Sequence, residues 1–294
     1  MAKMSEYAFV AAMLSTGLAT IAYLLYALSG LRAARLQTAG MPATGGAMGF
    51  ISGPRTAAIG RYATMLGWLA VFALLASMIF RTVATGHGPF ANMYEFSMAF
   101  AFGMLAAYMW FERTYHQRIL ALVALPVALA MMLYAATIPA TIEPLVPALQ
   151  NNLLLTVHVA VAIVAYGSFS IAFAASVLYL VQPSGGRWGL PKPSVLDEIG
   201  YRAVVVGFPF LTLTIILGAV WAETAWGSYW SWDPKETASL VTWLIYGAYL
   251  HARVVRGWRG SRAAWLLLFG FGATLFTYFG NLFFGGLHSY SGLG

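Results

Sequence analysis

The chain has 294 residues, of which 61% are hydrophobic and only 9% are charged. Soluble domains carry about 25% charged residues, so this composition excludes a soluble enzyme and indicates an integral membrane protein. The net charge of +7 does not indicate nucleic acid as a partner, because the basic residues fall in alternate loops. The sequence contains no cysteine, which excludes a disulfide, a thiolate metal site and a thiol relay within the chain.

Eight apolar runs are long enough to cross a hydrocarbon core of about 30 Å as helices. We therefore expect an all-α bundle of about eight transmembrane helices that forms one membrane domain, 1–294. The first run is long and lacks a convincing cleavage site, so we interpret it as a span and not as a removed signal peptide. The Gly-, Ala-, Pro- and Thr-rich segment 33–60 is interpreted as a flexible loop. The expected spans are 7–31, 62–83, 94–112, 119–137, 153–181, 201–223, 238–256 and 262–286.

The distribution of basic residues predicts the orientation of this bundle. Thirteen of the 16 Lys and Arg residues fall in four alternate loops, 32–61, 113–118, 182–202 and 252–262. The other side holds only Lys3 and Lys235, with Arg81 near the end of the second span. Because cytoplasmic loops are enriched in Lys and Arg, we expect a multi-pass protein of the inner or plasma membrane with both termini outside.

The outer loop 224–237 contains the densest tryptophan cluster of the chain. Its sequence from Trp226 to Thr237, WGSYWSWDPKET, combines four aromatic rings with three charges. Such a cluster suits a large, flat, hydrophobic ligand at the membrane surface, because Trp is bulky and amphipathic. An aromatic belt is the alternative, but a belt scatters its rings over many helix ends. Asp233, Pro234 and Glu236 are typical of a helix start with a capping box, and capping alone would explain both carboxylates.

The expected orientation sorts the five histidines into two groups. His158, His288 and His87 share the outer side with the tryptophan-rich loop, whereas His251 and His116 lie on the inner side. His251 follows 17 residues after the predicted start of the seventh helix, or about 25 Å deeper at ~1.5 Å per residue. It therefore cannot share a site with His158, whose depth favours a functional role. A solvated loop residue remains the alternative for His288, and an ordinary interfacial residue for His251.

Two imidazoles beside a tryptophan-rich surface indicate haem more than zinc. Zinc sites seldom include a cluster of tryptophans, and the outer candidate residues offer no obvious third protein ligand. Neutral imidazoles on opposite faces of a planar macrocycle are a ligand set of haem iron. A haem-dependent electron carrier is an alternative, although it would need both ligands of each haem within the bundle. A small-molecule transporter would show half-helices broken near the midplane, whereas single prolines such as Pro126 and Pro209 are tolerated in spans.

The stretch from Trp226 to Thr237 resembles the tryptophan-rich WWD signature of haem-handling membrane proteins. Its DPKE form is similar to the CcsA (ResC) branch of cytochrome c synthesis system II. The resemblance is close over 150–294 and patchy before it. Other agreeing stretches are LDEIGYR at 196–202, GFP at 207–209, GAVWA at 218–222, YLHAR at 249–253, GLHSY at 286–290 and GHGPFANMYE at 86–95.

This resemblance implies a set of roles for the candidate residues. His158 and His288 would be the outer axial ligands of haem b, and the catalytic group would comprise these two histidines and Asp233. His251 would bind a second haem within the membrane, whose opposite ligand comes from a CcsB (ResB)-type companion subunit. No role is expected for His87 and His116. The ring-binding platform would consist of Trp226, Tyr229, Trp230 and Trp232.

The resemblance also implies an activity. The chain would carry haem to the outer face of the membrane and, with its companion, act as a cytochrome c synthase (haem lyase). The acceptor would be the Cys-x-x-Cys-His segment of apocytochrome c, and thiol-reducing proteins and membrane lipid are further expected partners. A haem exporter that serves a separate chaperone is the alternative, although the WWD motif of such relatives departs from DPKE.

Overall fold

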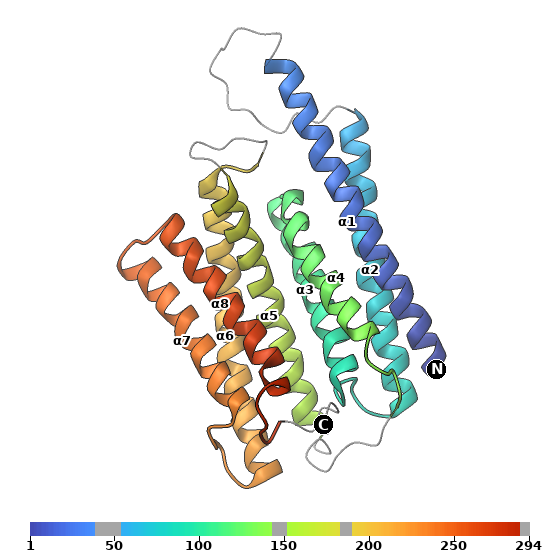
Figure 1. The fold of residues 1–294 in the computed structure, drawn as a ribbon, viewed down its shortest axis with the longest axis vertical. Helices are drawn as coiled ribbons and strands as arrows, with labels where there is room; N and C mark the ends of the chain where they lie inside the picture. The colour runs from blue at the N-terminus through green and yellow to red at the C-terminus, as the bar shows by residue number, and fades with distance from the viewer. Residues whose placement is uncertain (39–53, 143–151, 183–189, 289–294) are drawn as a thin grey trace.

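The structure, a computed structural model, describes residues 1–38, 54–142, 152–182 and 190–288. These residues form eight long α-helices that run alternately up and down the bundle, with two short 3-10 turns (Figure 1). The elements are α1 (Ala2–Thr38), α2 (Pro54–Thr85), α3 (Met93–Tyr115), η1 (Arg118–Leu120), α4 (Ala121–Ala136), α5 (Asn152–Val181), α6 (Pro193–Trp226), α7 (Pro234–Val255), α8 (Ser261–Phe279) and η3 (Gly280–Leu282).

Six segments within the described residues are long and apolar enough to cross a membrane. The expected multi-pass helical architecture is confirmed at this level. The helices α3 and α7 have 23 and 22 residues, or about 33 Å at ~1.5 Å per residue, but they are not among the six. The six are Ala2–Gly30, Pro54–Thr85, Arg118–Ala136, Leu153–Val181, Pro193–Trp226 and Ser261–Phe279.

The N-terminus, the α6–α7 loop and the end of α8 lie at the same end of the bundle (Figure 1). The expected loop 224–237 is non-helical only over 227–233, because α6 continues to Trp226 and α7 begins at Pro234. The assignment of this end to the outside of the membrane remains a prediction.

Several expected boundaries are wrong, including the start of the sixth span, which lies at Pro193 and not at 201. The segment 33–60 is helical over 33–38 and 54–60, because good helix formers extend α1 and Pro54 occupies the first position of α2, which suits proline. The eighth span ends as an α-helix at Phe279, and Gly280 begins a 3-10 turn. Residues 39–53, Arg187, Ser289 and Tyr290 lie outside the described part of the chain.

Close helix contacts bring α3, α5 and α7 together. Gly103 of α3 lies against Gly167 of α5, and a Cβ atom at either position would overlap the facing helix. On the other side of α5, the ring of Phe169 stacks on Tyr246 of α7 with centroids 3.8 Å apart. The helix α5 therefore packs directly on α3 and reaches α7 through the Phe169–Tyr246 ring pair, and residues from all three line a common space near one end of the bundle.

A buried ion pair holds the start of α3. Arg81 Nε lies 2.7 Å from Glu95 Oε1, and neither side chain is more than 1% exposed. The other guanidinium nitrogens of Arg81 donate to the carbonyl oxygens of Ala140 and Thr141. Glu95 also accepts a hydrogen bond from the Ala91 backbone N–H. This pairing satisfies both buried charges and fixes the end of α2 to the first turn of α3.

Candidate functional site

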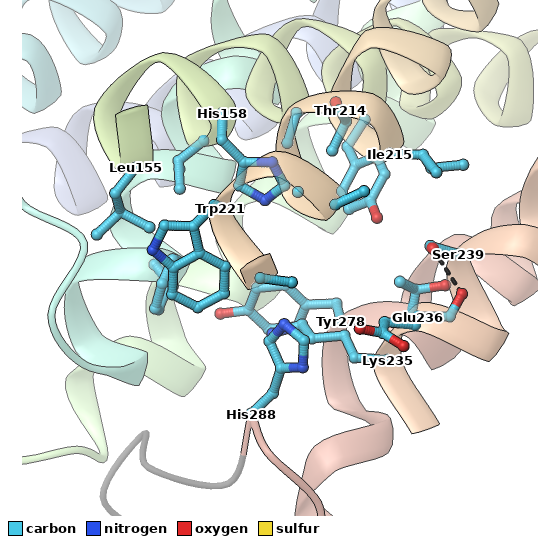
Figure 2. A pocket seen from close by; sticks show the side chains of 18 of the residues that line it. Leu155, His158, Thr214, Ile215, Trp221, Lys235, Glu236, Ser239, Tyr278 and His288 are labelled. Carbon is cyan, nitrogen blue, oxygen red and sulfur yellow. Dashed lines mark hydrogen bonds between the residues drawn. The ribbon is translucent and has the colours of Figure 1, made fainter. Parts of the chain in front are cut away.

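A cavity lies between α3, α5, α6 and α7, at the end of the bundle that carries the α6–α7 loop (Figure 2). The space within it and in its open mouth together amounts to about 1070 Å³. Tyr229 lines the cavity and is 60% exposed, so the cavity opens to the surface beside the α6–α7 loop. The walls are mainly apolar and aromatic, including Phe96, Phe100, Leu155, Val159, Ile215 and Trp221.

His158 enters this cavity from α5 (Figure 2). Its imidazole lies against Gly218 of α6, where a Cβ atom would be only 2.9 Å from His158 Cε1. The missing side chain at Gly218 thus provides the space for the ring. The Nδ1 atom of His158 is buried and has no hydrogen-bond partner among the described residues. An unpaired buried polar atom of this kind is rare and is often associated with a functional site.

His288 reaches the same cavity from the opposite side, beyond the end of α8 (Figure 2). Its Nδ1 atom lies 2.7 Å from Asp233 Oδ1. Burial lowers the pKa of His288, although the bond to Asp233 opposes this shift, so the imidazole is neutral at pH 7. The neutral ring donates from Nδ1 to the carboxylate, and this tautomer makes Nε2 the nitrogen that can bind a metal.

Asp233 connects the start of α7 to the segment that carries His288. Its side chain accepts from the backbone N–H groups of Lys235 at 2.9 Å and of Leu287 at 2.6 Å. The predicted capping box with Glu236 is confirmed. Burial alone would raise the pKa of Asp233, but the hydrogen bonds from His288, Lys235 and Leu287 lower it to about 2. Gly286 is needed here, because a Cβ atom on it would overlap the Asp233 carboxylate.

Two tryptophans surround His288. Trp226, the last residue of α6, packs edge-on against the His288 ring with centroids 4.8 Å apart. Trp221 is only 2% exposed and lies 5.9 Å from the same ring. Figure 2 shows the Trp221 indole beside the space between His158 and His288. Sequence reasoning did not assign Trp221 to the site, since it lies within an apolar run and outside the WWD signature.

The remaining aromatic residues of the loop differ in position. Tyr229 and Trp230 line the cavity. Trp232 does not line it and is 68% exposed, with its ring edge-on to Trp230 at 5.7 Å. Its backbone has a φ of +59°, which is an unusual conformation for a bulky residue. The cavity wall therefore includes Trp230 and Tyr229, whereas Trp226 supports His288 and Trp232 stands at the surface.

Two charged residues of the signature also line the cavity. Glu236 accepts hydrogen bonds from the backbone N–H groups of Ser231 and Asp233, so its carboxylate is already engaged in the N-terminal cap of α7. Lys235 extends toward α3, where its Nζ lies 5.7 Å from the centre of the Phe96 ring. Burial lowers the pKa of Lys235 to about 8, against the opposing effect of the Asp233 charge. The sequence alone suggests only a capping role for Glu236.

The other three histidines lie away from this cavity. His251 is exposed near the far end of α7, His116 is exposed at the end of α3, and His87 bonds the Gly88 carbonyl through Nδ1. None of them lines the cavity. His251 therefore lies apart from the pair His158 and His288, and a second site at His251 stays a prediction.

The donor set of the cavity restricts what it can hold. Among the described residues, no group of three or more His, Cys, Asp and Glu side chains is arranged for a metal ion. Two imidazoles in an apolar, aromatic cavity instead suit a metal that brings its own equatorial ligands. A flat macrocycle has this property.

Comparison with known proteins identifies the family. Residues 90–288 match the family described as Cytochrome C assembly protein. A protein of Synechococcus elongatus named "Cytochrome c biogenesis protein CcsA" is 37% identical over 79% of this chain and 87% of its own length. Proteins of the same name from Chlamydomonas reinhardtii and Porphyra purpurea are 40% and 33% identical, over 74% and 82% of this chain and 65% and 90% of their own lengths. The chain therefore belongs to the cytochrome c assembly protein family, among its CcsA-type members.

Proposed function

We propose that this chain binds haem b as a substrate in the cavity and presents it for covalent attachment to apocytochrome c. The observation that supports this proposal most strongly is the pair His158 and His288, which line one aromatic cavity from opposite sides. The names of its relatives support the same process, cytochrome c biogenesis. We expect this end of the bundle to face outside, as the distribution of basic residues predicts.

Each residue near the cavity has a defined part in this proposal. His158 and His288 hold the iron, His288 through Nε2, and Asp233 keeps His288 in the required tautomer and orientation. Trp221 and Trp226 fix the position of His288, whereas Trp230 and Tyr229 cover the ring near the cavity mouth. Two imidazole ligands leave no open position on the iron, which limits its reaction with oxygen.

The attachment reaction belongs mainly to the haem and the acceptor thiols. Each cysteine sulfur of the acceptor forms a bond to one vinyl carbon, and the thiol hydrogen is transferred to the other carbon of that vinyl group. No external oxidant or reductant is needed for this addition. The chain supplies orientation, because the cavity holds the ring and leaves one edge open beside Tyr229. The acceptor's own histidine then replaces His158 or His288 as the product leaves.

His251 belongs to a second proposed site, shared with a CcsB-type companion subunit. On α7 it lies in an exposed stripe that also contains Val241, Leu244, Ala248 and Val255. An exposed ionisable residue in an otherwise apolar stripe suggests a function at membrane depth. We propose that His251 provides one haem ligand and that a companion helix packed on this stripe provides the other.

Cytochrome c maturation in cells tests the proposed function. The chain is expressed with its companion in a strain that lacks its own assembly system, and covalent cytochrome is measured by haem staining. We expect His158→Gly and His288→Gly to abolish product, and the matched His87→Gly variant to retain it. Normal maturation by both cavity variants at wild-type protein levels would disprove the proposal.

The proposed second site is tested separately with His251→Ala and His116→Ala, each co-expressed with the companion. We expect only His251→Ala to lose the inner haem from the absorption spectrum. Full occupancy of this haem without the companion, together with its loss in His116→Ala, would rule out a shared site.

A further inference from the structure

Lys235 is the only Lys or Arg residue among the described residues that line the cavity. It is the second residue of α7, and its side chain reaches across to α3, with Nζ 5.7 Å from the centre of the Phe96 ring. Among the described residues, no carboxylate lies within 4.0 Å of this ammonium group. A charged donor is thus placed in a largely apolar cavity without an ion-pair partner from the chain.

Several neighbouring polar groups of the cavity are already engaged within the protein. The Glu236 carboxylate is used by the helix cap, and the Tyr278 hydroxyl lies 2.6 Å from the Ser97 hydroxyl. Three further hydroxyl groups donate to backbone carbonyls of their own helices. These belong to Thr214, Ser239 and Thr277. The ammonium of Lys235 is therefore the charged group of the cavity wall that remains available to a ligand.

Lys235 is partly buried, and a charge in a largely apolar cavity without a partner is costly, so its position favours a ligand that carries a negative group. The two imidazoles select a flat metal macrocycle, and the apolar walls cover its faces. Haem fits this combination, because it has two carboxylates on one edge and two vinyl groups away from that edge. A carboxylate bound to an ammonium makes a charge-assisted hydrogen bond, which is stronger than one between neutral groups.

We infer that Lys235 binds a carboxylate of the haem and thereby sets which edge of the ring faces the acceptor protein. This inference rests on the proposed function and adds a specificity-determining residue to it. With one carboxylate held at the α7–α3 side of the cavity, the vinyl groups lie on the side away from Lys235. The cation–π contact with Phe96 holds the ammonium near this position.

The test compares haem b with its dimethyl ester, which has the same ring, iron and vinyl groups but no carboxylate charge. The full chain is purified in detergent, and each ligand in its ferrous form is titrated by absorbance. The variants are Lys235→Gln, Lys235→Arg and the control Lys192→Gln, since Lys192 is exposed and does not line the cavity. Comparing variants with the same ligand cancels the different partition of the two ligands into detergent.

We expect Lys235→Gln to bind haem about 10- to 100-fold more weakly than the wild type, as for loss of a hydrogen bond between charged groups. The same variant should bind the dimethyl ester as tightly as the wild type does, which also shows that it is folded. Lys235→Arg should retain most of the preference for haem, and Lys192→Gln should behave as the wild type.

Two outcomes would contradict the inference about Lys235 without contradicting the proposed haem site. One is an unchanged preference of Lys235→Gln for haem over the ester. The other is an equal loss of affinity for both ligands, which would mean that Lys235 positions the loop and does not recognise a carboxylate. If the wild type binds neither ligand, the proposed function itself is wrong, and the inference fails with it.

Discussion

Asp233 is predicted to control haem binding through His288, and Asp233→Asn is the substitution that tests this role. In the structure Oδ1 accepts from Lys235 N–H and from His288 Nδ1, while Oδ2 accepts from Leu287 N–H. An asparagine has one oxygen acceptor, and its other terminal atom is an NH₂ donor. It therefore cannot reproduce this set of three bonds in either orientation.

Both orientations of the asparagine have a specific cost. With its oxygen toward His288, the NH₂ group faces the Leu287 N–H, and two donors oppose each other. With its oxygen toward Leu287, the NH₂ group donates to His288 Nδ1. The proton of the imidazole then moves to Nε2, which can no longer bind iron. Loss of such an outer partner typically reduces metal affinity about 10- to 100-fold, or ~1.4–2.7 kcal/mol.

The assay is a haem titration of the purified chain followed by absorbance. We expect Asp233→Asn to bind haem about 10- to 100-fold more weakly than the wild type. Glu236→Gln is the matched control, because it alters the same capping box without a bond to His288, and we expect less than about a threefold change, as for a weakened helix cap. Equal haem affinity of Asp233→Asn and the wild type would refute the reasoning.

Three further substitutions test other parts of the site and the fold. Gly218→Ala places a Cβ atom 2.9 Å from His158 Cε1 and should cost ~1–3 kcal/mol by overpacking. Gly218→Ala should therefore weaken haem binding. The control Gly272→Ala adds its Cβ atom in open space, so equal haem affinities of the two variants would count against the packing of His158 on Gly218. Trp226→Ala should reduce bound haem more than Trp226→Phe, because Phe retains a ring against His288; equal losses would contradict this contact. Arg81→Met leaves Glu95 buried and unpaired and should lower stability by ~3–5 kcal/mol. Arg202→Met breaks an exposed, solvent-screened pair that contributes little to stability, so similar melting temperatures of the two variants would refute the assignment.

Much of the fold follows from local sequence. Long apolar runs predict the helices, and the order Asp233, Pro234, Glu236 predicts the start of α7, which the structure confirms. The boundary errors arise where composition and helix propensity disagree. In the segment 33–60, small residues and glycines suggested a loop throughout, yet both of its ends are helical.

The contacts within the site were less predictable, because they join distant segments. The bond between Asp233 and His288 connects residues 55 positions apart, and no local pattern specifies it. Trp221 lies in an apolar run, so its packing against His288 depends on how α6 approaches the end of α8. The role of Lys235 in the cavity wall likewise depends on the distance from α7 to α3, which only the packed bundle defines.

The absorption spectrum of ferrous haem bound to the purified chain tests the central claim most directly. We predict the spectrum of low-spin iron with two imidazole ligands for the wild type and for His87→Gly. His158→Gly and His288→Gly should each lose one ligand, and added imidazole should restore the wild-type spectrum by filling the vacant position. A low-spin spectrum in both variants without added imidazole would contradict the assignment of His158 and His288 as the two iron ligands.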